Sequence, residues 1–428
     1  MKKCLLGITA LEACIVYFLL PYIQDDYAYS LIFAGINFCI VIFLIPKMNI
    51  PYWFYRYIFI IYSVKIVLFC VMYENISTYM GMFKIWDVTV FYQPEALAYL
   101  HGYTEGIQFY SKVVACIYYL FGTVMEIPVF LNIMISLFAD IIFYKILRNS
   151  NLSQKYTKFF LLVFMLLPWR NLQSLYMLRE AIPTFLVVVV LFYLQKFLTY
   201  KKNRYIVQAM MFSLTAMLFH SGLVALVVIT LLMVIFYDAE KDSFQCKKDN
   251  IYKAVFVIVF LGVVIGIAGN SLFYKFVLIF GKGETEMAAW AVAVADNAGS
   301  VYLQGLQYTS FVDIVWQAPI RMIYFLFSPM PWDCRNLKDV AAFSFDAMVH
   351  IVGVFYVLRN RFALYGTSKT LVKIILLMYI FASVILGAGT FDTGTAMRHR
   401  AKITSMIIIC MAIVYDCKQK HRLSRGER

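Results

Sequence analysis

Long apolar runs separated by short polar connections form the dominant pattern of this 428-residue chain. Many runs approach about 20 residues, the length that an α-helix needs to cross the hydrocarbon core of a bilayer. We predict an all-α polytopic membrane protein with about 12 transmembrane helices, forming a single integral membrane domain over residues 1–428. The expected spans are 4–23, 29–46, 53–73, 128–147, 157–176, 180–198, 204–220, 221–238, 251–269, 340–358, 370–388 and 402–416.

Two further apolar stretches do not match a simple span. The stretch 108–121 is short, and 312–328 carries Pro319 and Arg321 near its middle. We expect both to be interfacial or re-entrant helices, because irregular backbone at membrane depth is tolerated where protein buries it. Two large external segments, 74–127 and 270–339, result from this arrangement.

The basic residues support this topology, because lysine and arginine concentrate in short cytoplasmic loops. The basic connections all fall on one side only if 108–121 and 312–328 do not cross, and both termini are then cytoplasmic. If both stretches crossed, several basic loops would change sides. The basic connections are Lys2-Lys3, "RNSNLSQKYTK", "YKKNR", "CKKDN", "RNRF" and the tail "CKQKHRLSRGER".

Composition agrees with the membrane prediction and narrows the chemistry. The chain is 63% hydrophobic and 14% charged, with a mean hydropathy of +0.76, too little charge to cover a soluble surface. The net charge of +14 reflects cytoplasmic loops and anionic headgroups, so we expect membrane lipids and no nucleic acid as partners. The nine cysteines lack zinc spacing, and neither nucleotide-binding motifs nor clustered acids occur, so we expect no metal and no cofactor.

The segment "GTAMRHRAK", residues 394–402, faces outward in this topology, against the usual placement of cations. An anionic ligand would explain its charge. Arg398 and Arg400 are two positions apart and point in different directions on a helix, so one is expected to bind an anion while the other contacts lipid phosphate.

Two more arginines are expected at the same face. Arg179 and Glu180 restart a helix after Pro168, and the dipole at a helix N-terminus favours anions. A helix cap with an arginine reaching for the interface is the alternative interpretation. Arg321 lies inside an apolar stretch, where a cation is costly unless it is paired or lines a wet cavity.

Three residues are candidate catalytic groups. His220 lies at a sharp junction between two apolar runs, where packing is the alternative role. Asp87 follows Trp86, and an apolar neighbour could raise its pKa enough for work as a base; an ordinary loop acid is the alternative. Glu180 could orient a neighbouring arginine.

Arginines that are distant in sequence but meet at one face suit a diphosphate, because each guanidinium pairs bidentately with phosphate oxygens and stays charged. Glycosyl transfer from a lipid diphosphate needs fixed cations for the leaving group and a base for the acceptor hydroxyl. Arg179, Arg321, Arg398 and Arg400 are the predicted diphosphate ligands, and His220, Asp87 and Glu180 the predicted catalytic residues.

Five segments follow one another along the chain: "WDVTVFYQPEALAYLHG", "LLPWRNLQSLYMLREAIPTFL", "KKNRYIVQAMMFSLTAMLFHSG", "LFSPMPWDCRN" and "GTAMRHRAKI". In this order they resemble segments of bacterial polysaccharide polymerases, namely O-antigen-type repeat-unit polymerases and their exopolysaccharide relatives within the C-type glycosyltransferase group. The resemblance implies polymerisation of undecaprenyl-diphosphate-linked oligosaccharides at the outer face of the bacterial cytoplasmic (inner) membrane. Family arginines would correspond to Arg179, Arg321 and Arg398, with His220 nearby, and the family's external acid to Asp87.

Lipid-linked oligosaccharides are then the expected substrates, and a flippase and a chain-length regulator are further expected partners. A transporter or flippase of lipid-linked oligosaccharide is the main alternative, and it would need polar residues deep in several spans, such as Lys65 and Asp140. A C-type enzyme that uses a polyprenyl-monophosphate sugar donor also stays open.

Overall fold

The computed structural model describes residues 48–78, 87–238, 241–245, 252, 255, 300–306, 308 and 311–424. This part of the chain is helical, apart from one isolated bridge and a hairpin in which Tyr237–Asp238 (β1) pairs antiparallel with Ser243–Phe244 (β2). The all-α class is therefore confirmed for the described residues.

Contacts divide the chain into two compact units. Unit 1 contains residues 1–141 and 170–182, and unit 2 contains residues 142–169 and 183–428. A single membrane domain stays a prediction.

Five helical segments in the described part are long and apolar enough to cross a membrane, judged by length and composition. Each corresponds to an expected span. The expected spans 4–23 and 29–46 lie outside the described residues, as does 251–269 apart from residues 252 and 255. The five segments are Tyr52–Phe69, Glu126–Asn149, Ala181–Tyr200, Leu337–Arg359 and Gly366–Ala388.

The expected span 157–176 is wrong as a single helix. Helix α7 covers Gln154–Met165, and a separate short helix, α8, begins at Pro168 and ends at Gln173. Proline lacks the N–H that would continue the helix, and its ring disfavours helical backbone at the preceding residue. Twelve residues of α-helix measure roughly 18 Å, well short of the hydrocarbon core.

Unit 1 combines one long apolar helix with short helices. Its helix α5, Phe109–Phe121, is roughly 20 Å long, too short to cross the hydrocarbon core upright. Helix α4 packs against α5. The other elements that lie in unit 1, wholly or in part, are α3 (Tyr52–Thr78), the π-helix η4 (Val88–Tyr92), α4 (Gln93–Leu100), α6 (Glu126–Asn149, up to Ile141) and α8.

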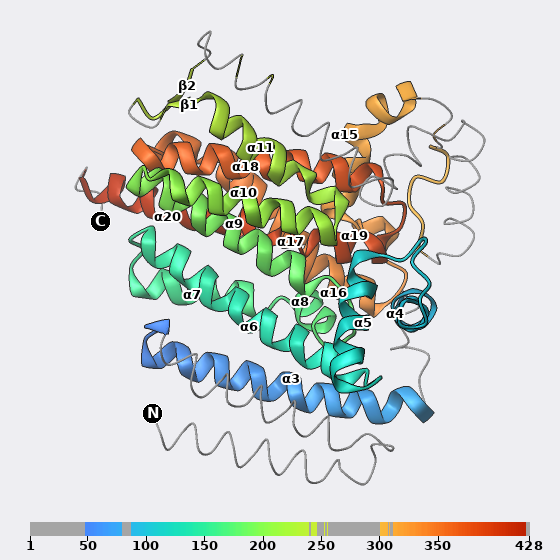
Figure 1. The fold of residues 1–428 in the computed structure, drawn as a ribbon. Coiled ribbons are helices and arrows are strands. Elements are labelled where there is room, and N and C mark those ends of the chain that lie inside the picture. Colours follow the sequence, from blue (N-terminus) through green and yellow to red (C-terminus); the bar gives the residue numbers. More distant parts are fainter. Residues whose placement is uncertain are drawn as a thin grey trace. The chain divides into compact units, whose positions relative to one another are not determined.

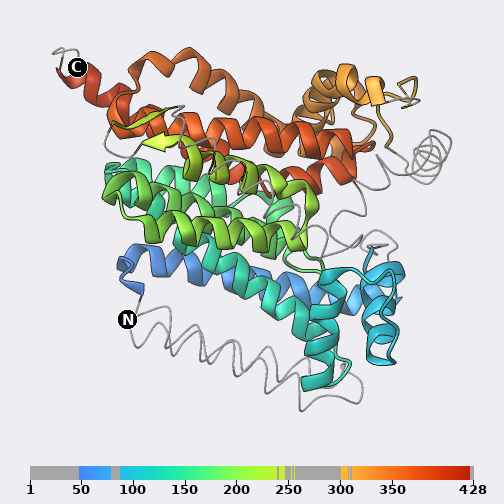
Figure 2. The same cartoon turned by 45° about the horizontal axis from the view of Figure 1, so that its top comes forward.

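Unit 2 is built around helix α18, Gly366–Ala388, which packs against α11, α15 and α20 (Figure 1). Helix α20 also packs against α7 and α17. In both views α10, α11, α18 and α20 run side by side along their lengths (Figures 1 and 2). Further elements are α9 (Ala181–Tyr200, from Pro183 on), α10 (Asn203–Phe219), η5 (Ser221–Leu223), α11 (Val224–Phe236), α15 (Phe311–Phe327), η6 (Pro331–Asp333), α16 (Leu337–Ala342), η7 (Phe343–Ala347), α17 (Met348–Arg359), η8 (Arg361–Ala363), α19 (Thr393–Arg400) and α20 (Thr404–Ser424).

Candidate functional site

The seven predicted site residues are distributed over both units. Unit 1 contains Asp87, Arg179 and Glu180, and unit 2 contains the remaining four. Within unit 2, one of these four directly follows α10, one lies on α15 and two lie on α19, and α15 packs against α19. The remaining four are His220, Arg321, Arg398 and Arg400.

In unit 1, Arg179 is held by the N-terminus of α5. Its Nη1 donates to Oε1 of Gln108, 3.1 Å away. Gln108 in turn donates to Glu95 from its backbone nitrogen at 3.0 Å and from Nε2 at 3.2 Å, and Ser111 Oγ donates to the same carboxylate at 2.6 Å. The first N–H groups of any helix have no partner within that helix. At the start of α5, Glu95 accepts from the backbone nitrogen of Gln108 and from the hydroxyl of Ser111. The sequence shows Glu95 only as one acid among several.

Glu180 is fully buried, and its Oε1 lies 3.9 Å from Nε of Arg179, whose side chain is 15% exposed. The two side chains are therefore close to each other, and the orienting role of Glu180 stays a prediction. Asp87 is half-buried at the N-terminus of η4. Trp86 lies outside the described residues, so the expected Asp87–Trp86 contact stays a prediction.

Arg321 lies in the middle of α15 with a fully buried side chain. Nε donates to Oε1 of Gln317 at 2.9 Å, and Nη2 donates to the carbonyl of Leu306. Its Nη1 has no hydrogen-bond partner among the described residues. The guanidinium carbon lies 4.3 Å from the ring centre of Tyr308 and 4.8 Å from that of Phe391.

No carboxylate of the described residues forms an ion pair with Arg321. Burial lowers the pKa of its guanidinium, and the hydroxyls of Tyr308 and Tyr302 oppose that change. Two aromatic faces supply a weak attraction for a cation, but an uncompensated buried charge is costly. This arrangement would be stabilised by an anion.

Residues 300–306 and Tyr308 place the aromatic rings of Tyr308 and Phe391 beside Arg321. Tyr302 N donates to the carbonyl of Phe391 at 3.1 Å, and Val301 forms an antiparallel bridge with Asp392. The hydroxyl of Tyr308 donates to the carbonyl of Ala388 at 3.0 Å. These contacts attach the segment to the end of α18 and the start of α19, and so bring Tyr308 beside Arg321.

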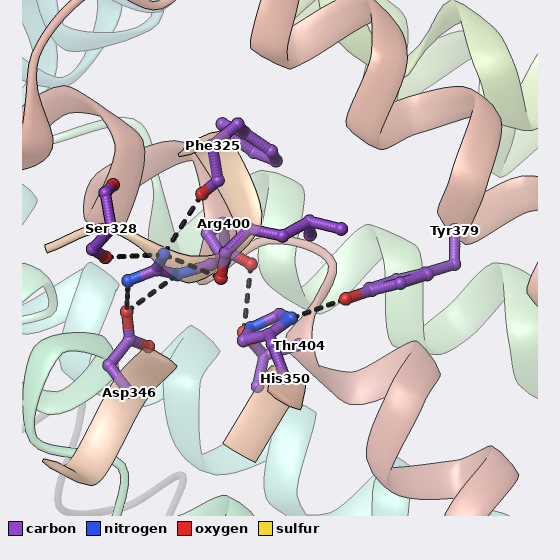
Figure 3. Close-up of polar contacts among 8 residues, drawn as sticks. Phe325, Ser328, Asp346, His350, Tyr379, Arg400 and Thr404 are labelled. Atoms are coloured by element: carbon purple, nitrogen blue, oxygen red, sulfur yellow. Dashed lines mark hydrogen bonds and ion pairs between the residues drawn. The ribbon is translucent and has the colours of Figure 1, made fainter. Parts of the chain in front are cut away.

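Arg400 has a different environment, shown in Figure 3. Its Nε donates to Oδ2 of Asp346 at 2.8 Å, and Nη2 contacts the same oxygen. Its Nη1 contacts the carbonyls of Phe325 at 3.0 Å, Leu326 at 2.8 Å and Ser328 at 2.8 Å. All three guanidinium nitrogens thus donate to protein oxygens. A phosphate would have to displace these partners, so the geometry favours a structural role for Arg400.

Arg398 is on the same short helix as Arg400 but is only partly buried. Asp392 caps this helix by accepting from the backbone nitrogen of Thr395 at 2.8 Å. Of the two arginines, Arg398 is the one whose side chain retains exposure for a ligand.

His220 lies against a histidine that the sequence did not single out, His399. The ring centres are 4.6 Å apart with the planes at 78°, and both side chains are buried. His220 ends α10 in extended backbone, at φ −151° and ψ 105°. Two residues later Gly222 leaves the room that this junction needs, because a Cβ there would lie 2.4 Å from Cδ2 of Leu386.

The hydrogen bonds around His399 determine which ring nitrogen carries the proton. Its Nδ1 lies 3.2 Å from Oγ1 of Thr390, and that hydroxyl donates to the carbonyl of Leu386 at 2.6 Å. A hydroxyl has one hydrogen, so Thr390 must accept from Nδ1–H of His399. Nε2 is then the basic nitrogen of the neutral ring. His399 lies in the segment "GTAMRHRAK", and this was the one signal for it in the sequence. The sequence-based interpretation of that segment considered the two arginines and not the histidine between them.

No protein-family model, curated protein or solved structure matches the chain. The fold and site therefore define the class in physical terms. The described part of the chain is helical, with five segments suited by length and composition to crossing a membrane. Unit 2 contains a buried arginine that has no ion pair among the described residues, and a buried histidine pair. Among the described residues, no three His, Cys, Asp or Glu side chains are grouped so that they could hold a metal ion.

Proposed function

We propose that this chain is a membrane glycosyltransferase that polymerises undecaprenyl-diphosphate-linked oligosaccharide repeat units for a surface polysaccharide. The proposal places the reaction at the outer face of the bacterial cytoplasmic membrane and keeps both termini cytoplasmic. The buried Arg321 supports it most strongly, because Nη1 is unpartnered in the described structure and no described carboxylate pairs with it.

In the proposed reaction, the acceptor hydroxyl attacks the anomeric carbon of the donor sugar. The bond between that carbon and the diphosphate oxygen breaks, and undecaprenyl diphosphate leaves with the bonding electrons. Arg321 stabilises the growing charge on the leaving diphosphate, and Arg398 supplies a second cation from α19. Preorganised donors of this kind contribute about 10²–10³-fold each to the rate. Arg179 stays a predicted ligand in unit 1.

The acceptor hydroxyl must lose its proton in this reaction, and the histidine pair in unit 2 is suited to take it. His399 presents Nε2 as a basic nitrogen because Thr390 holds the proton on Nδ1. His220, the predicted base, lies against the same ring. A positioned base contributes about 10²–10⁴-fold. Asp87 and Glu180 stay candidate catalytic residues in unit 1.

The test deletes the gene in its source bacterium and restores it with wild-type or Arg321→Gln coding sequence. We expect the deletion to leave single lipid-linked repeat units at the outer face of the membrane and no polymer ladder. The wild-type gene restores the ladder, and Arg321→Gln does not at equal protein level. A ladder that persists in the deletion strain, or full restoration by Arg321→Gln, overturns the proposal.

Transport of lipid-linked oligosaccharide is the second candidate, and a charged cluster inside unit 1 favours it. Nη1 of Arg170 pairs with Oδ1 of Asp140 at 2.7 Å, and Nζ of Lys65 donates to Oγ of Ser136 at 2.6 Å. Lys65, Asp140 and Arg170 are at most 4% exposed, and the first two lie on apolar helices. Charged groups at membrane depth commonly mark a transport pathway. In that case the deletion strain accumulates single repeat units at the cytoplasmic face.

A further inference from the structure

One helical stretch in unit 2, formed by η7 and α17, contacts Arg400 directly through Asp346 and indirectly through His350 and Thr404 (Figure 3). Asp346 on η7 and His350 on α17 are four residues apart and therefore share a helix face. Asp346 accepts from the guanidinium of Arg400. Nε2 of His350 lies 3.0 Å from Oγ1 of Thr404, which itself donates to the carbonyl of Arg400 at 2.9 Å. The stretch thus holds both the side chain and the backbone of Arg400.

The direction of each hydrogen bond in this network follows from the hydroxyl of Thr404. Its one hydrogen is donated to the carbonyl of Arg400, so Oγ1 must accept from Nε2–H of His350. In the neutral ring, Nδ1 of His350 then accepts from the hydroxyl of Tyr379, 2.7 Å away. The hydrogen bonds therefore assign the proton of the neutral ring to Nε2. The chain of donors ends on an amide carbonyl, which is a very weak base, so the network fixes geometry and does not conduct protons.

Arg400 is the last residue of α19, and residues 401–403 form a turn before α20, here called the α19–α20 corner. Helix α19 ends at Arg400 and α20 begins at Thr404, with a turn in which Ile403 N donates to the carbonyl of Arg400 at 3.0 Å. Arg398 and His399 immediately precede the corner. A rotation of α19 about this corner would move both side chains relative to His220 and Arg321.

We propose that His350 is a positioning residue. Together with Asp346 it fixes the α19–α20 corner, so that His399 and Arg398 are held at the transfer site while His350 itself contacts no substrate. The activity part of this inference rests on the proposed function, but the hydrogen-bond pattern does not.

The first test reads the ring nitrogens of histidine by NMR in purified, ¹⁵N-histidine-labelled protein in nanodiscs. The chain has five histidines, so His350→Gln identifies the signals of His350 by their loss. We expect Nε2 of His350 to carry the proton and Nδ1 to be an acceptor. Tyr379→Phe should shift the Nδ1 signal and leave the proton on Nε2. A proton on Nδ1 of His350 in the wild-type protein would overturn the inference, whatever reaction the chain performs.

The second test compares Thr404→Val, which removes the hydroxyl at nearly constant volume, with Thr404→Ser, which keeps it. We expect Thr404→Val to lower the polymerisation rate at saturating repeat unit by about 10- to 100-fold, since small misplacements of a reacting group have effects of this size. The KM should change little, and Thr404→Ser should retain most of the rate. Equal rates for the two variants at equal protein level would overturn the positioning role. If Arg321→Gln is fully active while the tautomer of His350 is as expected, the proposed function fails and the network stands.

If Thr404→Val does not fold, Tyr379→Phe replaces it in the rate comparison. Loss of one hydroxyl from the far end of the network should lower the rate less than Thr404→Val, because the bond between His350 and Thr404 remains. A wild-type rate for Tyr379→Phe together with an unshifted Nδ1 signal would contradict the inference.

Discussion

Arg321 and Arg400 are both fully buried in unit 2, yet their surroundings differ. Arg400 meets a carboxylate and three backbone carbonyls, which together satisfy its charge and its donors. Arg321 meets one side-chain amide, one carbonyl and two aromatic rings, with no counter-charge among the described residues. Burial therefore does not by itself indicate a ligand site; the missing counter-charge does. This difference separates an arginine that maintains the fold from one suited to an anion.

The largest effect on stability should come from breaking the Arg400 pair. Asp346→Asn leaves a buried guanidinium without its charge partner, and breaking one side of a buried pair costs about 3–5 kcal/mol. Thermal unfolding in detergent should show a clear drop in the midpoint. Asp416→Asn is the matched control, because its pair with the half-exposed Lys420 is worth about 1 kcal/mol or less. Equal midpoints for the two variants would contradict the claim that the buried Arg400–Asp346 pair stabilises the fold.

Arg321→Met should show the opposite behaviour. It removes an uncompensated buried charge at similar volume, so the free energy of unfolding should stay the same or rise. Polymerisation should nevertheless fall by about 10²–10³-fold, the usual effect of removing one donor from a developing anion. Unfolding midpoints and polymer formation measured on the same preparation check this pairing. A strongly destabilised Arg321→Met would place Arg321 in the same structural class as Arg400.

Ligand binding should show whether Arg321 takes an anion. Inorganic diphosphate at 100 times its Kd would stabilise the folded protein by about 2.7 kcal/mol, provided that it binds only the native state. We expect a diphosphate-dependent rise in the thermal midpoint for the wild type and little or none for Arg321→Met. Sulfate at the same ionic strength controls for general salt effects. The same rise in both proteins would show that diphosphate binds elsewhere.

The smallest predicted effect concerns the histidine pair. Gly222→Ala places a Cβ against Leu386 and beside the ring of His220, and overpacking of this kind costs about 1–3 kcal/mol. We expect a modest fall in the midpoint and a larger fall in activity, because His220 must move relative to His399. Adding Leu386→Ala should recover part of the activity by making room. Unchanged activity in Gly222→Ala would argue against a need for the exact His220–His399 contact.

The helical class and the five apolar segments that the described residues contain were predictable, because apolar length is a local property of the chain. The break at Pro168 is local as well: the sequence predicts a helix restart after this proline, although the expected span 157–176 ran across it. The prediction for Arg398 came from a cation placed against the topology rule, that for Arg179 from its place at a helix N-terminus, and that for Arg321 from the cost of a cation in an apolar stretch. Their roles stay proposals.

Pairing was not predictable, because it depends on contacts between distant residues. Arg400 and Asp346 are 54 positions apart, and the sequence around Arg400 does not show which residue pairs with it. One signal was available: Asp346 and His350, four apart in the otherwise apolar stretch 340–358, form a polar stripe on one helix face. Glu95 and His399 were present in sequence segments already quoted, but only the fold shows what they contact.

The central claim is that Arg321, a buried arginine without a counter-ion among the described residues, serves a leaving diphosphate. The most direct test incubates purified wild-type and Arg321→Met protein in nanodiscs with the lipid-linked repeat unit, and follows polymer length together with released undecaprenyl diphosphate. We predict that the wild type forms a ladder and releases one undecaprenyl diphosphate for each unit joined, while a correctly folded Arg321→Met does neither at a comparable rate. A wild-type protein that forms no ladder, or an Arg321→Met protein of full activity, would contradict the account.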